Sequence, residues 1–126
     1  MEGGFAPFSF RTKSGKLSGF EVALAKDVAK QLKLKPVFVQ TKFDSLISGL
    51  DTKKYDVVYN DMSITPERQK SYTFGREYLF TKSVLITKKG SDIKTYADLK
   101  GKRAAETTSS NFSQAAKKAG AQIVAA

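Results

Sequence analysis

The segment Tyr55-Asp-Val-Val-Tyr59 runs directly into Asn60-Asp-Met-Ser-Ile-Thr-Pro-Glu-Arg68, and together they indicate the fold. The first five residues are a short apolar run of β-forming side chains, which is typical of a buried strand. Thr65 then offers a helix N-cap, and Pro66 suits the first helical position. The sequence here therefore predicts a strand, a polar loop and a helix, the repeating unit of an α/β protein.

The residues before this segment alternate between strand and helix patterns. We expect a β-hairpin begun by residues 5–15, an amphipathic helix at 20–32, a strand at 36–40 and a helix at 43–50. Apolar residues recur every three or four positions in the first helix, and Glu21 is expected on its solvent-facing side. The alternation predicts a mostly parallel sheet flanked by helices, with any ligand site at the carboxyl ends of the strands.

The residues after this segment contain a long strand-like run and a smaller α/β unit. Residues 78–88 are rich in β-forming side chains, and Thr95 can cap a short helix ending at Leu99. A strand at 102–106, a helix at 112–118 and a strand at 121–125 are then expected. A single βαβ unit of this size is too small to hold a hydrophobic core by itself.

The composition excludes several classes of function. The 126 residues include no cysteine and no histidine, which removes disulfides, thiolate metal sites and the commonest general base. No apolar run approaches the roughly 18 residues that a membrane span needs. The formal net charge is +10, but the lysines are scattered singly or in pairs. We therefore expect a solvated basic surface, with no nucleic-acid partner, no metal and no cofactor.

Two polar loops, residues 60–68 and 107–111, each follow a predicted strand and precede a predicted helix. The unsatisfied N–H groups at a helix start can hold a carboxylate, and Arg68 could add a bidentate fork. Hydroxyl-rich N-caps are also ordinary structural features, so the loops alone leave both interpretations open. Paired carboxylates in a suitable context, a Ser/Lys dyad and a phosphate-binding glycine loop do not occur, so little indicates an enzyme.

Aromatic and acidic residues also fall near the predicted strand ends. Phe5, Phe8 and Phe43 could form an apolar wall for a small ligand, although such side chains are usually part of a core. Glu2 could meet an ammonium group, although an acidic residue near a chain end is usually just solvated.

The order of these motifs resembles the polar amino-acid-binding proteins of bacterial uptake transporters, the extracellular solute-binding proteins of family 3. The matching segments, in chain order, are Glu2-Gly-Gly-Phe-Ala-Pro-Phe8, Gly15-Lys-Leu-Ser-Gly-Phe-Glu21, Phe43-Asp-Ser-Leu-Ile-Ser-Gly-Leu50, Tyr55-Asp-Val-Val58, Met62-Ser-Ile-Thr-Pro-Glu-Arg68 and Ala97-Asp-Leu-Lys-Gly-Lys102. The resemblance covers almost the whole chain, and its most specific element is Ser63-Ile-Thr-x-x-Arg68.

This resemblance implies an α/β, periplasmic-binding-protein-like (type II) fold, in which two lobes close on an amino acid. It places lobe I, with a parallel-rich sheet flanked by helices, at residues 1–82, a hinge strand at 83–90 and part of lobe II at 91–126. The protein would bind an amino-acid ligand outside the cytoplasm, in the periplasm or lipid-anchored at the cell surface. Its further partner would be the membrane permease of an ABC transporter.

The resemblance also implies a binding site for the carboxylate, ammonium group and side chain of the ligand. Its residues lie near the chain start, at the second helix and in the two polar loops; they are Glu2, Phe5, Phe43, Asn60, Asp61, Met62, Ser63, Arg68, Thr107, Ser110 and Asn111. Arg68 and Ser63 would hold the carboxylate from the first lobe. Ser110 and Asn111 would hold it from the second.

The other implied roles concern the ammonium group and the side chain. Glu2 and the backbone at Asn60 would face the ammonium group, while Phe5 and Phe43 would flank the side chain. Ser109 stands where glycine is common in the family, and Phe112 replaces a polar position. Together with Phe5 and Phe43, these two departures suggest a ligand whose side chain is apolar or contains sulfur. Cystine is the first expectation and a polar amino acid the second.

Departures from the family pattern keep other functions open. The chain resembles little more than half of a family member, so its last βαβ unit would have open strand edges. It would then be either disordered or paired with the same unit of a second copy, and of the two we expect self-association. Related proteins also include ligand-binding sensor domains of receptors, and enzymes such as dehydratases and lytic transglycosylases. A cleft glutamate with a raised pKa would distinguish an enzyme from a binding protein.

Overall fold

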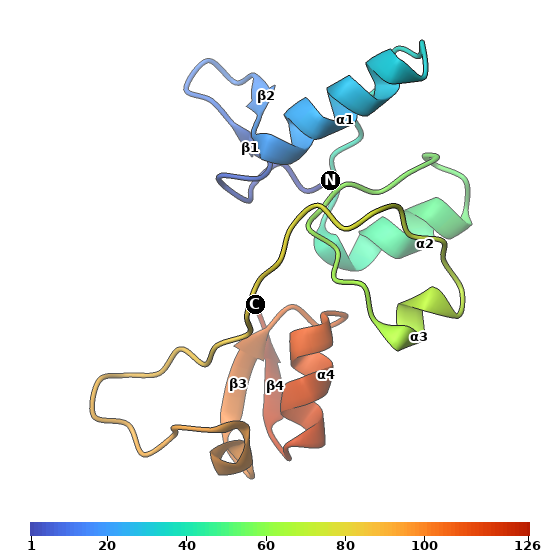
Figure 1. Cartoon of the computed structure of the whole chain (residues 1–126). Coiled ribbons are helices and arrows are strands. Elements are labelled where there is room, and N and C mark those ends of the chain that lie inside the picture. The colour runs from blue at the N-terminus through green and yellow to red at the C-terminus, as the bar shows by residue number, and fades with distance from the viewer. The chain divides into compact units, whose positions relative to one another are not determined.

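The computed structural model describes residues 1–126, which form two compact units, Met1–Met62 and Ser63–Ala126 (Figure 1). Each unit combines helices with one pair of short strands. The expected lobe and hinge boundaries, 1–82, 83–90 and 91–126, stay a prediction. The two compact units meet between Met62 and Ser63, which is a different kind of boundary. No helix is both long and apolar enough to cross a lipid bilayer.

The N-terminal unit contains the predicted hairpin. β1 (Phe10–Arg11) pairs antiparallel with β2 (Leu17–Ser18), and the Thr12 N–H donates to the Lys16 carbonyl across the turn at 2.9 Å. Gly15, with φ of 80°, adopts a left-handed conformation in this turn, which glycine tolerates best. The hairpin is confirmed, with strands of only two residues each.

α1 (Phe20–Gln31) confirms the predicted amphipathic helix, and it begins directly after Gly19. A Cβ atom at Gly19 would lie 2.2 Å from the Phe8 carbonyl oxygen, so the close approach of the two backbones requires glycine. Val22 and Ala25 are buried on the inner face. The expectation that Glu21 faces solvent is wrong, because Glu21 is fully buried at the first turn.

The next helical segment is a 3-10 turn, Phe43–Ser45, that continues into α2 (Leu46–Asp51), as the spacing of apolar residues predicts. Leu46 is fully buried, and its carbonyl oxygen accepts a hydrogen bond from the Tyr55 hydroxyl at 2.6 Å. The same hydroxyl lies against Gly49, where a Cβ atom would be only 2.2 Å away. Tyr55 therefore fastens the chain that follows α2 back onto the helix.

The expected strands at residues 36–40 and 55–59 do not form, so the parallel-rich sheet of the first lobe is absent from the N-terminal unit. Val37 is 84% exposed and Val57 is 60% exposed, so these β-forming residues have no covering layer. A parallel ladder needs partners far apart in the sequence and helices over both faces. Local β-preference predicted the extended character of these segments but could not supply their partners.

The C-terminal unit begins with α3 (Pro66–Gln69), whose start is as predicted. The Thr65 hydroxyl oxygen accepts a hydrogen bond from the Arg68 backbone N–H at 3.2 Å, and Pro66 occupies the first turn. The long strand expected at residues 78–88 is wrong, because no backbone ladder forms there and Ile86 is 94% exposed. An isolated β-like run again lacks a partner strand.

The last part of the unit is the predicted βαβ element (Figure 1). A 3-10 turn, Tyr96–Leu99, precedes β3 (Arg103–Glu106), α4 (Asn111–Lys118) and β4 (Gln122–Ala125). β3 and β4 are parallel, with Arg103 opposite Gln122 and Glu106 opposite Ala125. α4 contacts both strands and buries Ala116. This element confirms the α/β pattern expected from the sequence.

Candidate functional site

In the N-terminal unit, the side chain of Asn60 holds Glu2. The Asn60 Oδ1 atom accepts a hydrogen bond from the Glu2 backbone N–H at 2.7 Å, and its Nδ2 donates to the Glu2 Oε2 atom at 2.9 Å. Asn60 is buried, while Glu2 is half-buried. Two hydrogen bonds from one amide fix both the backbone and the carboxylate of Glu2, so a partly accessible anion is held in a defined position.

The residues on either side of Glu2 have their own contacts. The Gln40 side chain donates to the Glu2 carbonyl at 3.4 Å, and Arg11 donates to Gln40 from the hairpin. The Gly3 N–H donates to the buried Ser9 hydroxyl oxygen at 3.3 Å. The segment around Glu2 is therefore tied to three different parts of the N-terminal unit.

Asp61 lies in a left-handed conformation, with φ of 47°, directly after Asn60. A residue other than glycine is uncommon there, and such residues gather at functional loops. The Asp61 backbone N–H donates to the Glu21 Oε1 atom of α1. Partial burial raises the pKa of the Asp61 carboxyl above its ordinary value. Sequence reasoning missed Glu21 because its partner lies 40 residues away in the chain.

The aromatic residues are only partly brought together. Phe5 and Phe8 stack with ring centroids 5.2 Å apart and an angle of 28° between the ring planes. Phe5 is 44% exposed, so its ring offers an apolar surface next to solvent. Phe43 is half-buried at the start of the 3-10 turn before α2, and no ring contact joins it to Phe5 or Phe8.

The loop of the C-terminal unit before α3 brings Ser63 and Arg68 together, as expected. The Arg68 Nη1 atom donates to the Ser63 carbonyl oxygen at 3.0 Å. Partial burial lowers the pKa of Arg68 from its ordinary value, although a guanidinium stays charged near neutral pH. A guanidinium carries five N–H donors, so this bond orients Arg68 while leaving it chemically suited to a carboxylate.

The second polar loop forms the N-cap of α4. The buried Ser110 hydroxyl oxygen accepts from the Ser113 N–H at 2.9 Å, and the hydroxyl donates to Glu106 at 3.4 Å. The Ser110 N–H bonds the Thr107 carbonyl at 3.0 Å, which closes a turn. Asn111 is the first residue of α4. Thr107, Ser110 and Asn111 therefore share one short structure at a helix N-terminus, where the dipole favours an anion.

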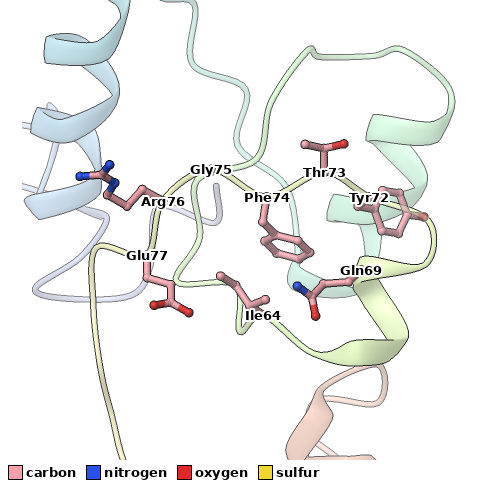
Figure 2. Close-up of a pocket in the computed structure, with 8 residues that line it drawn as sticks. All are labelled: Ile64, Gln69, Tyr72, Thr73, Phe74, Gly75, Arg76 and Glu77. Atoms are coloured by element: carbon pink, nitrogen blue, oxygen red, sulfur yellow. The ribbon is translucent and has the colours of Figure 1, made fainter.

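A surface cavity of about 510 Å³ also lies in the C-terminal unit. It is lined by Ile64, Gln69, Tyr72, Thr73, Phe74, Gly75, Arg76 and Glu77. Figure 2 shows Phe74 pointing toward Ile64 and Gln69, while the side chains of Thr73 and Arg76 point away. None of the site residues expected from the sequence lines this cavity.

The structure thus assembles three local groups from the expected residues. Glu2 joins Asn60, Ser63 joins Arg68, and Thr107 shares a turn with Ser110 and Asn111. Met62 is half-buried in the chain between the first two groups. The N-terminal unit thus offers an anion at Glu2, and the C-terminal unit offers a cation at Arg68 and a helix N-terminus at α4.

Known proteins with similar sequences bind amino acids. The chain is 44% identical over 124 residues to a probable amino-acid ABC transporter-binding protein of Haemophilus influenzae, covering 98% of this chain and 48% of that protein. It is 40% identical over 124 residues to the L-cystine-binding protein TcyA of Bacillus subtilis, covering 97% and 46%. The chain spans about half the length of these curated relatives.

Solved structures show the same fold. An ancestral arginine-binding protein bound to arginine matches with a TM-score of 0.88 and 39% identity, over 99% of this chain and 57% of that one. An ancestral amino-acid-binding protein, a precursor of cyclohexadienyl dehydratase, matches with a TM-score of 0.83 and 37% identity, over 99% and 58%. The chain therefore has the α/β fold of the amino-acid-binding proteins, as expected.

The profile of one protein family matches the chain from residue 1 to residue 126. The family is extracellular, which agrees with the expected location outside the cytoplasm. On the match over its whole length and the identities above, the chain belongs to the bacterial extracellular solute-binding proteins, family 3.

Proposed function

We propose that this chain is a ligand-binding part of the substrate-binding component of an amino-acid ABC uptake transporter. The observation that carries the proposal is the position of Arg68, half-buried at the start of α3 and oriented by the Ser63 carbonyl. Such an arginine can hold a carboxylate through a charge-assisted pair of hydrogen bonds. The relatives in Haemophilus influenzae and Bacillus subtilis support the assignment.

In this proposal the ligand is a zwitterion held at both of its charged ends. Arg68 and Ser63 bind the carboxylate, and the N-terminus of α4, with Ser110 and Asn111, binds it from the second lobe. Glu2, fixed by Asn60, binds the ammonium group. Phe5 and Phe43 flank the ligand side chain. Asp61, Met62 and Thr107 complete the loops that carry these groups.

We propose L-cystine as the first ligand to test and L-arginine as the second. Cystine is bound by the Bacillus subtilis relative, and the exposed ring of Phe5 can offer an apolar contact to a sulfur-containing side chain. Arginine is the ligand in one of the similar solved structures. The permease of the transporter would receive the ligand. The net charge of +10 would be a property of the surface and would not mark a nucleic-acid site.

We further propose that the chain is not an enzyme. Glu67, one of three glutamates near the candidate loops, forms an exposed ion pair with Lys70 at 3.5 Å. Glu106 accepts a hydrogen bond from Ser110, and Glu2 accepts one from Asn60. Each of these carboxylates thus has a partner within the chain. To act as a general acid, one of them would instead have to reach a reacting atom. The dehydratase precursor among the similar structures is itself described as an amino-acid-binding protein.

The proposal is tested by titrating the full-length protein with L-cystine and L-arginine by calorimetry, for wild type, Arg68→Ala and Arg76→Ala. Arg68→Ala should weaken binding by about 2–5 kcal/mol, roughly 30-fold or more, because it removes the charged partner of the carboxylate. Arg76→Ala is the matched control, since Arg76 is an exposed arginine in the same unit. An Arg68→Ala affinity within about threefold of wild type would contradict the assignment.

The partner expected from the open βαβ edges is a second copy of the chain. β3 and β4 pair only with each other, and Val124 and Phe112 are exposed beside them. Unpaired edges with exposed apolar residues favour pairing with an identical element. Light scattering of the 126-residue chain should give a mass above the 13.8 kDa of one copy. A strict monomer with well-protected β3 and β4 amides would contradict this proposal.

A further inference from the structure

Glu21 is a buried acidic residue that the proposed ligand contacts do not use. It lies in the first turn of α1 and has 0% of its surface exposed. A carboxylate removed from water is costly unless it is hydrogen-bonded, so a fully buried glutamate calls for a structural reason. The sequence pattern gives none, because at this position of the amphipathic helix a glutamate would ordinarily face solvent.

The contacts of Glu21 join two loops of the N-terminal unit. Its backbone N–H donates to the Phe8 carbonyl oxygen at 3.0 Å, which fixes the loop that carries the stacked Phe5 and Phe8 rings. Its side-chain Oε1 accepts the backbone N–H of Asp61, which fixes the loop that carries Asn60. One residue therefore sets the position of both loops relative to the start of α1.

The second of these loops needs such support. Asp61 has a left-handed backbone, with φ of 47°, which a residue other than glycine adopts at a cost. That conformation persists only where the surroundings fix it. The preceding residue, Asn60, makes the two hydrogen bonds that hold Glu2. If Asp61 relaxed to an ordinary conformation, the direction of the chain at Asn60 would change and Glu2 would lose its support.

We propose that Glu21 is a positioning residue that holds Asp61 in its left-handed conformation, so that Asn60 presents Glu2 to the ammonium group of the ligand. This inference rests on the proposed function for its ligand, but its structural part does not. Glu21 acts as a hydrogen-bond acceptor of a particular length, not only as a negative charge beside the positive end of the α1 dipole.

These two roles are separated by two conservative variants. Glu21→Gln keeps the length of the side chain and an acceptor oxygen but removes the charge. Glu21→Asp keeps the charge in the first turn but shortens the side chain by one methylene, so it should not reach the Asp61 N–H. Asp27→Asn is the matched control, because Asp27 is an exposed carboxylate in the same helix.

Two measurements are made on the full-length protein: hydrogen exchange of the Asp61 amide, with the Ala25 amide of α1 as a reference for folding, and the affinity for L-cystine and L-arginine. In Glu21→Asp, Asp61 exchange should rise and affinity should fall by about tenfold or more, since a charge-assisted hydrogen bond is lost. In Glu21→Gln both should stay within about fivefold of wild type, and Ala25 exchange should be unchanged in both variants.

The opposite pattern overturns the inference: Glu21→Asp behaving as wild type while Glu21→Gln loses Asp61 protection would show that only the charge matters. Equal loss of Ala25 and Asp61 protection in Glu21→Asp would show a general structural role, and would also overturn it. If wild type binds neither amino acid, the two proposed ligands fail at that point. The Asp61 exchange pattern then still decides whether Glu21 holds the loop.

Discussion

The two polar loops of the chain differ in where their hydrogen bonds come from. Asn60 bonds to Glu2, 58 residues earlier in the chain, and Asp61 bonds to Glu21, 40 residues earlier. In the second loop, Ser110 bonds to Ser113, three residues later. The start of the first loop, at Asn60 and Asp61, therefore depends on distant parts of the N-terminal unit. The hydrogen bonds of the second loop form whenever α4 forms. Substitutions in the two loops should therefore affect different parts of the chain.

The largest effect is expected at Asn60, because it holds the long-range contact. Asn60→Ala removes both hydrogen bonds to Glu2 from a buried position and should lower the free energy of unfolding by about 1–3 kcal/mol. Hydrogen exchange should also rise at Glu2 and Gly3, far from the substitution in sequence. Urea unfolding and residue-resolved exchange measure the two effects.

The control for Asn60 is Gln114→Ala, which removes an exposed amide side chain from α4. A surface change of this kind should alter stability by less than about 0.5 kcal/mol. If Asn60→Ala changed exchange only at residues next to it, the first loop would be as local as the second, and the contrast between the loops would be lost.

The same contrast explains which features the sequence could predict. Thr65 was recognisable as an N-cap because it bonds to a residue three positions later. α1 followed from a repeat within a dozen residues. The buried position of Glu21 could not be predicted, because it depends on a backbone N–H that only the folded chain brings near.

The strands show the same limit on what the sequence can predict. β3 and β4 were predicted, and they pair across a single helix, so their partner is close in sequence. Residues 36–40 have equally strong β-forming character but form no ladder, and Val37 stays exposed. Strand propensity reports that a segment fits a sheet, and only the availability of neighbouring strands decides whether the sheet forms.

A smaller and more local effect is expected at Ser110. Ser110→Ala removes the N-cap of α4 and should lower stability by about 1 kcal/mol. Faster exchange should be confined to the first turn of α4, including the Ser113 amide, and should leave the N-terminal unit unchanged. Ser110→Thr should restore the cap, because its hydroxyl can also accept from the first turn and donate to Glu106.

The neighbouring hydroxyl supplies the control for this prediction. Thr108→Ala removes an exposed side chain from the same loop and should leave Ser113 exchange unchanged. Faster exchange in the N-terminal unit after Ser110→Ala would show that the second loop also has long-range partners, contrary to its observed hydrogen bonds.

The smallest effect concerns Asp98, whose contacts are both local and exposed. Its Oδ2 atom accepts hydrogen bonds from the backbone N–H groups of Lys94 and Thr95 at 3.0 and 2.8 Å. These bonds favour the carboxylate and hold the pKa of Asp98 below its ordinary value. A carboxyl whose pKa is lower in the folded state stabilises that state above its unfolded pKa, about 3.9.

The stabilisation is therefore fully present at neutral pH and is lost as the pH falls through the folded pKa of Asp98. As the pH falls below about 3.9, the Lys94 and Thr95 amides should lose protection, after correction for the intrinsic pH dependence of exchange. Asp98→Asn should remove this pH dependence, whereas Asp92→Asn, which changes an exposed carboxylate nearby, should not. The same pH dependence of this protection in wild type and in Asp98→Asn would show that the carboxylate does not hold this turn. Because the bonds span three and four residues at the surface, even their complete loss should leave the amides of the N-terminal unit unaffected.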